Sequence, residues 1–171
     1  ITSNIESNIT SNVESNTTNA KLTDADALAV GKDLYKKAEY YYPLPLAKGI
    51  NEVCTANEDK TGYVDCTTLY AELQKVYVAN HEVFKQFTLK DGKYLYYYGG
   101  MGAIGSNETT LTLKSNELDK LTFTATTVST YPGQDGQADE TKTETADFVV
   151  VKENGTWKVS AYTFRPANTL K

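Results

Sequence analysis

The second half of this chain alternates threonine with apolar residues, and this alternation constrains the possible folds more than any other feature. Residues 109–115 and 121–131 show the pattern, which is typical of strands with one buried face. Residues 148–151 and 157–164 flank Glu153-Asn154-Gly155, whose Asn-Gly pair favours a hairpin turn because both residues tolerate a positive φ. We therefore predict an antiparallel meander in this half of the chain.

Two helices are predicted before the strands. The first begins after Thr23, whose hydroxyl can cap a helix, and ends before Pro43 and Pro45, since proline cannot donate a backbone hydrogen bond. The second spans about residues 67–87, with Asn80 as a candidate interruption. The side chains expected to face the core are Leu28, Leu34, Tyr35, Ala38, Tyr41 and Tyr42 in the first helix, and Leu69, Leu73, Val76, Tyr77, Val83, Phe84 and Phe87 in the second. Helices followed by a meander indicate an α+β fold, with N-terminal helices packed on a curved antiparallel β-sheet.

The N-terminal residues 1–20 repeat a four-residue unit that begins with Ser-Asn. Serine and asparagine compete for backbone hydrogen bonds and are poor helix formers, so we predict a tether that holds a domain away from a surface. The alternative is a partly helical segment, because apolar residues recur at every fourth position from Ile1 to Val13. Residues 21–171 are predicted to form a single α+β domain, which is long enough for one core.

Charge and cysteine content bear on partners and compartment. The net charge of −5 argues against nucleic acid as a partner, because its phosphates would be repelled. No run of apolar residues approaches membrane-spanning length, so no transmembrane segment is predicted. Cys54 and Cys66, the two cysteines, are predicted to form a disulfide, which indicates an oxidising compartment. We expect a protein that is secreted or associated with the cell surface or cell wall.

A glycine-rich stretch follows a predicted strand at residues 94–98, which Asp91-Gly92 introduces as a hairpin turn. Residues 100–105 spell G-x-G-x-x-G, the fingerprint of a dinucleotide-binding turn. That fingerprint requires a helix directly after the glycines, whereas alternating threonine and leucine predict a strand here. We therefore predict no cofactor, and interpret the stretch as an exposed loop whose apolar Met101 and Ile104 enter a partner's cleft.

Tyrosine is unusually abundant, with 13 copies against 5 phenylalanines and 1 tryptophan. Its ring offers a large, rigid contact area at low entropy cost. On a strand, Tyr96 and Tyr98 share one side and Tyr97 takes the other. The predicted partner-binding residues are Tyr96, Tyr98, Gly99, Gly100, Met101, Gly102, Ala103, Ile104, Gly105, Ser106, Asn107 and Glu108.

The sequence offers no convincing catalytic or metal site. A thiol nucleophile needs a histidine base, and His81, the single histidine, follows Asn80 in a predicted helix with core-facing neighbours. The cysteines lack the C-x-x-C spacing of a zinc site. Carboxylates are plentiful, but nothing singles out a pair of them. We predict no catalytic residue, no metal site and no enzymatic activity.

Four segments together resemble the secreted DL-endopeptidase inhibitors of Gram-positive bacteria, which restrain autolysins in the cell wall. The segments are ALAVGKDLYKKAEYYY, TTLYAELQKVYVANHEVF, DGKYLYYYGGMGAIG and FVVVKENGTWKVSAYTF. The resemblance implies a non-enzymatic protein that occludes the active cleft of a wall hydrolase of the cysteine-peptidase type.

The closing NGTWKV segment also resembles nuclear-transport-factor-like and cystatin-like domains. The alternative hypothesis is therefore a secreted, cone-shaped domain that binds a small molecule or has hydrolase or isomerase activity in a pocket. Such a pocket is expected to hold a buried carboxylate with a raised pKa.

Overall fold

The computed structural model describes residues 20–41, 54–56, 62–97, 106–133 and 137–161. In chain order the elements are α1 (Asp24–Tyr41), β1 (Thr55–Ala56), β2 (Tyr63–Asp65), α3 (Thr67–Val76), the 3-10 helix η2 (Glu82–Gln86), β3 (Phe87–Lys90), β4 (Lys93–Tyr97), β5 (Ser106–Asn116), β6 (Lys120–Tyr131), β7 (Glu140–Glu153) and β8 (Thr156–Ala161). The predicted tether up to residue 19, the two prolines expected to end the first helix, and the predicted strand end at 162–164 lie outside the described residues.

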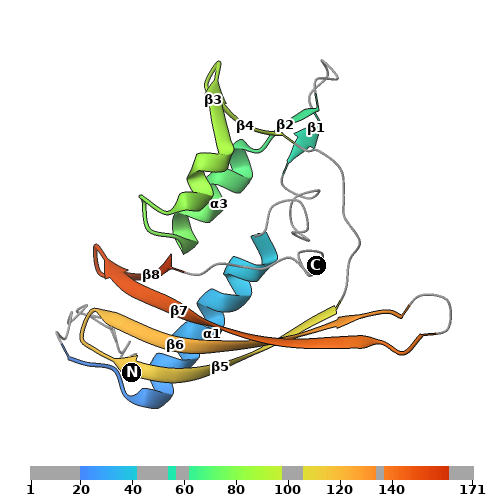
Figure 1. The fold of residues 1–171 in the computed structure, drawn as a ribbon. Coiled ribbons are helices and arrows are strands. Elements are labelled where there is room, and N and C mark those ends of the chain that lie inside the picture. The colour runs from blue at the N-terminus through green and yellow to red at the C-terminus, as the bar shows by residue number, and fades with distance from the viewer. Residues whose placement is uncertain (1–19, 42–53, 57–61, 98–105, 134–136, 162–171) are drawn as a thin grey trace, which may run out of the picture.

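Within the described residues the strands form two antiparallel sheets of four strands each. We call β1-β2-β4-β3 the small sheet and β5-β6-β7-β8 the large sheet. The predicted α+β class is confirmed, but the predicted meander is divided, because β4 pairs with β2 and β3 and β5 pairs with β6. Figure 1 shows α1 lying across one face of the large sheet and α3 lying between the two sheets.

Helix α1 begins with the predicted cap. The Thr23 Oγ1 accepts a hydrogen bond from the Asp26 N–H at 3.1 Å, and the Thr23 hydroxyl donates to the Asp26 carboxylate at 2.7 Å. These bonds satisfy an N–H that the first helical turn leaves without a partner. The buried residues recur three or four apart, and they are Ala27, Gly31, Leu34, Tyr35 and Ala38. The expected inward face is therefore confirmed, with Leu28 half-buried; the side chains of Tyr41 and Tyr42 fall outside the described part.

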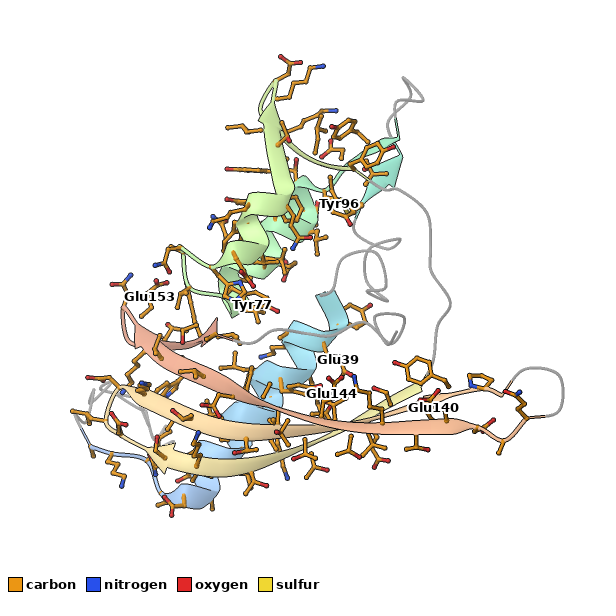
Figure 2. All side chains as sticks on the ribbon, in the orientation of Figure 1. Glu39, Tyr77, Tyr96, Glu140, Glu144 and Glu153 are labelled. Carbon is orange, nitrogen blue, oxygen red and sulfur yellow. A yellow bond between two sulfur atoms is a disulfide. The ribbon has the colours of Figure 1, made fainter. Side chains whose placement is uncertain are left out.

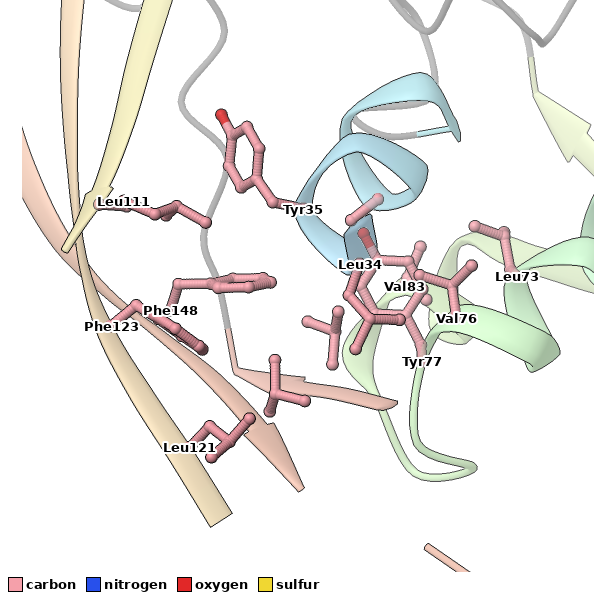
Figure 3. Packing of buried hydrophobic residues seen from close by; sticks show 14 of the residues in the cluster. Leu34, Tyr35, Leu73, Val76, Tyr77, Val83, Leu111, Leu121, Phe123 and Phe148 are labelled. Carbon is pink, nitrogen blue, oxygen red and sulfur yellow. The ribbon is translucent and has the colours of Figure 1, made fainter. Parts of the chain in front are cut away.

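The core lies between α1 and the large sheet and continues to α3. On β6, Phe123 and its apolar neighbours two positions away are buried, while the intervening threonines are half-exposed. Phe148 of β7 is the register partner of Phe123, and its ring meets the Tyr35 ring edge-on at 5.7 Å (Figure 3). One hydrophobic cluster extends from these residues to Leu73 of α3 and Tyr96 of the small sheet. Both sheets therefore share a single core.

The helix predicted at 67–87 is shorter than expected. It ends just before Tyr77, which is extended (φ −106°, ψ 150°) and forms a parallel bridge with Val159 of β8. The Val78 N–H donates to the Val159 carbonyl at 3.0 Å, and a turn containing Asn80 follows. The Val78 N–H thus bonds to the edge of β8, whereas in a longer helix it would bond to a carbonyl of the same helix. The rest of the predicted helix forms η2 and the start of β3.

Both predicted hairpin turns are confirmed. Asp91 and Gly92 have φ values of 51° and 77°, and Asn154 and Gly155 have φ values of 52° and 79°. Positive φ at both central residues is what a two-residue turn needs to match the twist of its strands. Strand β7 begins at Glu140, well before the predicted residue 148, because it pairs with β6 along the whole length of β6.

Gly31 lets α1 lie directly on the Phe123 ring, and this contact yields a first prediction. A Cβ at Gly31 would lie 2.7 Å from Cε1 of Phe123, which is closer than carbon atoms approach without displacement. We expect Gly31→Ala to lower the free energy of unfolding by about 1–3 kcal/mol, because overpacking outweighs the roughly 0.5–1 kcal/mol that alanine contributes in a helix. Chemical denaturation measures this difference.

Phe123→Leu provides the matched second change. A smaller side chain relieves the collision, so the double variant should be more stable than the sum of the two single effects. Strictly additive effects, or a stabilised Gly31→Ala variant, would contradict the close-contact explanation.

Candidate functional site

Two exposed tyrosines meet at one end of the small sheet, and we call them the aromatic pair. Tyr63 of β2 and Tyr97 of β4 are register partners, and their ring centroids lie 5.2 Å apart at an interplanar angle of 67°. Tyr63 is 38% exposed and Tyr97 is 57% exposed. Gly62 has a φ of 79°, and a Cβ there would lie 3.0 Å from the Tyr97 ring. A glycine at this position therefore leaves room for the Tyr97 ring beside the residue that precedes β2.

The aromatic pair corrects the predicted orientation of the tyrosine strand. Tyr96, predicted to contact a partner, is 8% exposed and belongs to the core (Figure 2). Alternation along β4 places Tyr94 and Tyr96 on one face, where Phe87 lies 6.1 Å from Tyr96 and where α3 packs. Among the tyrosines of β4, the most exposed one is therefore Tyr97, which lies on the opposite side of the strand from the predicted contact residue Tyr96.

The remaining predicted contact residues fall into two groups. Tyr98, Gly99, Gly100, Met101, Gly102, Ala103, Ile104 and Gly105 lie outside the described residues. Ser106, Asn107 and Glu108 form the start of β5, where they pair with β6, so the predicted loop is three residues shorter at this end. The glycine-rich segment therefore leads directly from Tyr97 to the first residue of β5.

Aromatic rings also pack on the other face of the small sheet, opposite the aromatic pair, and hold the sheet against α3. Tyr70 of α3 stacks on Tyr94 with 3.5 Å between ring centroids and 6° between ring planes. The Tyr70 ring also lies 4.9 Å from Phe84 and 5.3 Å from Phe87. Burial, together with Tyr94, raises the pKa of Tyr70, so its hydroxyl stays neutral at physiological pH. Such contacts between rigid side chains hold α3 firmly against β3 and β4.

A disulfide lies at the other end of strand β2. Cys54 and Cys66 form the predicted bond, with 4.4 Å between their Cα atoms. Cys66 is fully buried and directly precedes α3, so the bond ties Cys54, the residue before β1, to the start of this helix.

A polar cluster beside the disulfide joins β2, α3 and β4. The Asp65 carboxylate accepts hydrogen bonds from the Thr67 N–H at 3.1 Å and the Thr67 hydroxyl at 2.7 Å, and forms an ion pair with Lys93 at 3.3 Å. The Thr67 Oγ1 in turn accepts a hydrogen bond from the Tyr94 N–H at 3.1 Å. The Thr67 hydroxyl contributes most to a lowered pKa of Asp65, followed by the Thr67 N–H.

A cleft of about 450 Å³ opens where α1, α3 and β8 meet. It is lined by Val30, Asp33, Leu34, Lys37, Glu72, Lys75, Val76, Thr156 and Trp157. Each carboxylate is ion-paired with a lysine of its own helix, Asp33 with Lys37 and Glu72 with Lys75, both at 2.7 Å. These carboxylates reach solvent, whereas the small-molecule hypothesis calls for a buried acid.

Two carboxyl groups of the described chain have a shifted pKa, and both shifts are downward. Asp65 is one. The other is Glu153 in the β7–β8 hairpin (Figure 2), which accepts a hydrogen bond from the Ala79 N–H at 3.3 Å and pairs with Lys158 at 2.9 Å. Lys158, then the Ala79 N–H, lower the pKa of Glu153. These shifts are opposite in sign to the one that the small-molecule hypothesis expects.

The cysteines and the histidine have structural roles that do not suit thiol catalysis. Both cysteines are held in the disulfide. His81 is buried; its Nδ1 accepts a hydrogen bond from the Val83 N–H at 3.1 Å and thereby caps η2. Burial lowers the pKa of His81, which keeps the ring neutral and able to accept this bond.

Comparison of the chain with protein-family models, with curated proteins and with solved structures found no match. Among the residues that the structure describes, no helix combines the length and the apolar character needed to cross a membrane. In the same part of the chain, no group of three or more His, Cys, Asp or Glu side chains is arranged to hold a metal ion. Function must therefore be inferred from the chemistry of the surfaces themselves.

The polar cluster predicts a specific loss of stability in acid. Because the pKa of Asp65 is lowered on folding, its contribution is present above the ordinary value of 3.8 and is lost as pH falls through the folded-state pKa. We expect Asp65→Ala to cost about 0.5–1.5 kcal/mol at neutral pH, the usual net contribution of a hydrogen bond. Urea titrations across the acid range should show the difference from the parent shrinking below pH 3.8.

Glu117→Gln, an exposed change elsewhere, is the control and should show no such pH dependence. A constant difference between Asp65→Ala and the parent at every pH would show that ionisation of Asp65 does not matter.

The disulfide provides a third prediction. The bond closes a loop with a sequence separation of 12 residues. Loop-closure entropy then predicts that Cys54→Ala/Cys66→Ala lowers the free energy of unfolding by about 3 kcal/mol. Denaturant titrations with and without a reducing agent test this value: the agent should destabilise the parent and leave the double variant unchanged. Equal sensitivity of both proteins to reduction would refute it.

Proposed function

We propose that this chain is a secreted, non-enzymatic binding protein that inhibits a peptidoglycan DL-endopeptidase of the cell wall. The observation that carries the proposal is the aromatic pair, two exposed tyrosines at the root of the glycine-rich segment. Tyr97 is the last described residue before that segment, and Ser106 is the first after it. The inhibitor would approach its target with this end of the small sheet.

Binding through the aromatic pair costs little conformational entropy. Tyrosine side chains on a rigid support lose little entropy on binding, and such aromatic anchors carry much of the energy in protein interfaces. The stack under the sheet, the disulfide and the polar cluster supply the support. The apolar Met101 and Ile104 of the adjoining segment then enter the partner's active cleft.

The proposed location outside the cell agrees with the presence of a disulfide. Disulfides persist in oxidising compartments, and a wall enzyme operates outside the cell. Inhibition by occlusion needs no nucleophile, base or cofactor, so structural roles for both cysteines and His81 are consistent with it.

Substitutions in the segment and the aromatic pair test the proposal. Met101→Asp, Ile104→Asp and Tyr97→Ser should each weaken inhibition of a purified wall DL-endopeptidase about tenfold or more, the range of interface anchors. The melting temperature should stay nearly unchanged, because Tyr97 is exposed. Release of muropeptides from purified cell walls measures the inhibition.

Leu89→Asp is the matched control, since Leu89 is 63% exposed on the same sheet near the β3–β4 turn. The Leu89→Asp variant should inhibit the endopeptidase as strongly as the parent protein. If Met101→Asp and Ile104→Asp also inhibit like the parent, the segment is not the contact; if the parent itself does not inhibit, the proposed function is wrong.

A further inference from the structure

The cleft between α1, α3 and β8 is a second surface, built from other residues than the aromatic pair. Its volume of about 450 Å³ falls within the usual range of ligand sites. Val30 and Leu34 of α1, Val76 of α3 and the half-buried Trp157 of β8 supply its apolar lining. The proposed inhibitory contact uses none of these side chains.

The charges around the cleft are balanced. Helix α1 contributes Asp33 and Lys37, and helix α3 contributes Glu72 and Lys75. Three of the four side chains are more than half exposed, and Glu72 is 32% exposed. Ion pairs in such positions contribute little to stability, so a ligand can exchange partners with them at small cost. Two ammonium and two carboxylate groups beside an apolar lining match a ligand with both charges and aliphatic side chains.

We propose that this cleft binds a short zwitterionic peptide of the class that forms peptidoglycan stems. The tetrapeptide L-Ala-γ-D-Glu-L-Lys-D-Ala carries two carboxylates and two ammonium groups between small aliphatic groups. Its carboxylates pair with Lys37 and Lys75, its ammonium groups pair with Asp33 and Glu72, and a methyl group packs on Trp157. The choice of a wall peptide rests on the proposed function, whereas the zwitterionic, aliphatic character follows from the cleft.

Two observations favour a peptide over a polyanion or a glycan. The two lysines that line the cleft are matched by two lining carboxylates, and with Lys152 beside Trp157 the excess is a single positive charge, which is small for a ligand with several phosphate groups. Lys152 places its Nζ 5.4 Å from the centre of the Trp157 ring, so one face that a sugar would stack on is already occupied.

Trp157 gives a direct readout, because it is the single tryptophan of the chain. Titration with the tetrapeptide should give a saturable change in tryptophan fluorescence that weakens as salt is added. The same peptide with an acetylated amino end and an amidated carboxyl end should bind more weakly. No saturable change, equal binding of the blocked peptide, or tighter binding of a chitin oligosaccharide would each overturn the proposal.

Matched lysine variants locate the contact. Lys37→Gln and Lys75→Gln should each weaken tetrapeptide binding about two- to fivefold, the range of one exposed charge pair. Lys36→Gln, an exposed change on α1 that does not line the cleft, should bind like the parent. If Lys36→Gln weakens binding as much as Lys37→Gln, general charge and not the cleft is responsible.

The two proposals fail separately. Lys37→Gln and Lys75→Gln should inhibit the endopeptidase like the parent, and Tyr97→Ser should bind the tetrapeptide like the parent. Peptide binding without inhibition would reject the inhibitor function and keep the peptide site, while inhibition without peptide binding would do the reverse.

Discussion

The backbone pairing between the end of α3 and the edge of β8 is the interaction on which the rest of this structure depends. Tyr77 bridges to Val159, the Val78 N–H donates to the same residue, and Glu153 accepts from the Ala79 N–H. These bonds stop the helix and fix it to the large sheet, with the Tyr77 side chain fully buried in the joint. The joint therefore adds backbone hydrogen bonds to the apolar core that the two sheets share.

Both surfaces for which we propose a role follow from the position of α3. One side of the helix places Tyr70 against the small sheet and covers the face with Tyr94, while Tyr97 lies on the other face and stays exposed. Another side places Glu72 and Lys75 opposite α1, which creates the cleft. A single helix therefore supports the aromatic pair and lines the cleft, although the two surfaces share no residue.

Features that depend on a few neighbouring residues were predictable from the sequence. The Thr23 cap and the positive-φ turns at Asp91-Gly92 and Asn154-Gly155 are local, because each is decided by its own side chains and backbone angles. The alternation along β6 identified its buried face for the same reason, since period two is a property of the strand itself. The disulfide was predictable because the chain has two cysteines.

The sequence by itself thus determined the α+β class, the two hairpin turns, the Thr23 cap and the core-facing sides of the helices. Tertiary structure decided where α3 stops, that Tyr96 is covered and Tyr97 exposed, and that Tyr63 lies beside Tyr97. A helix pattern cannot show which strand edge will compete for its hydrogen bonds, and a run of three tyrosines cannot show which face a distant helix will cover. These outcomes depend on contacts between residues far apart in the chain, and such contacts exist only once the chain has folded.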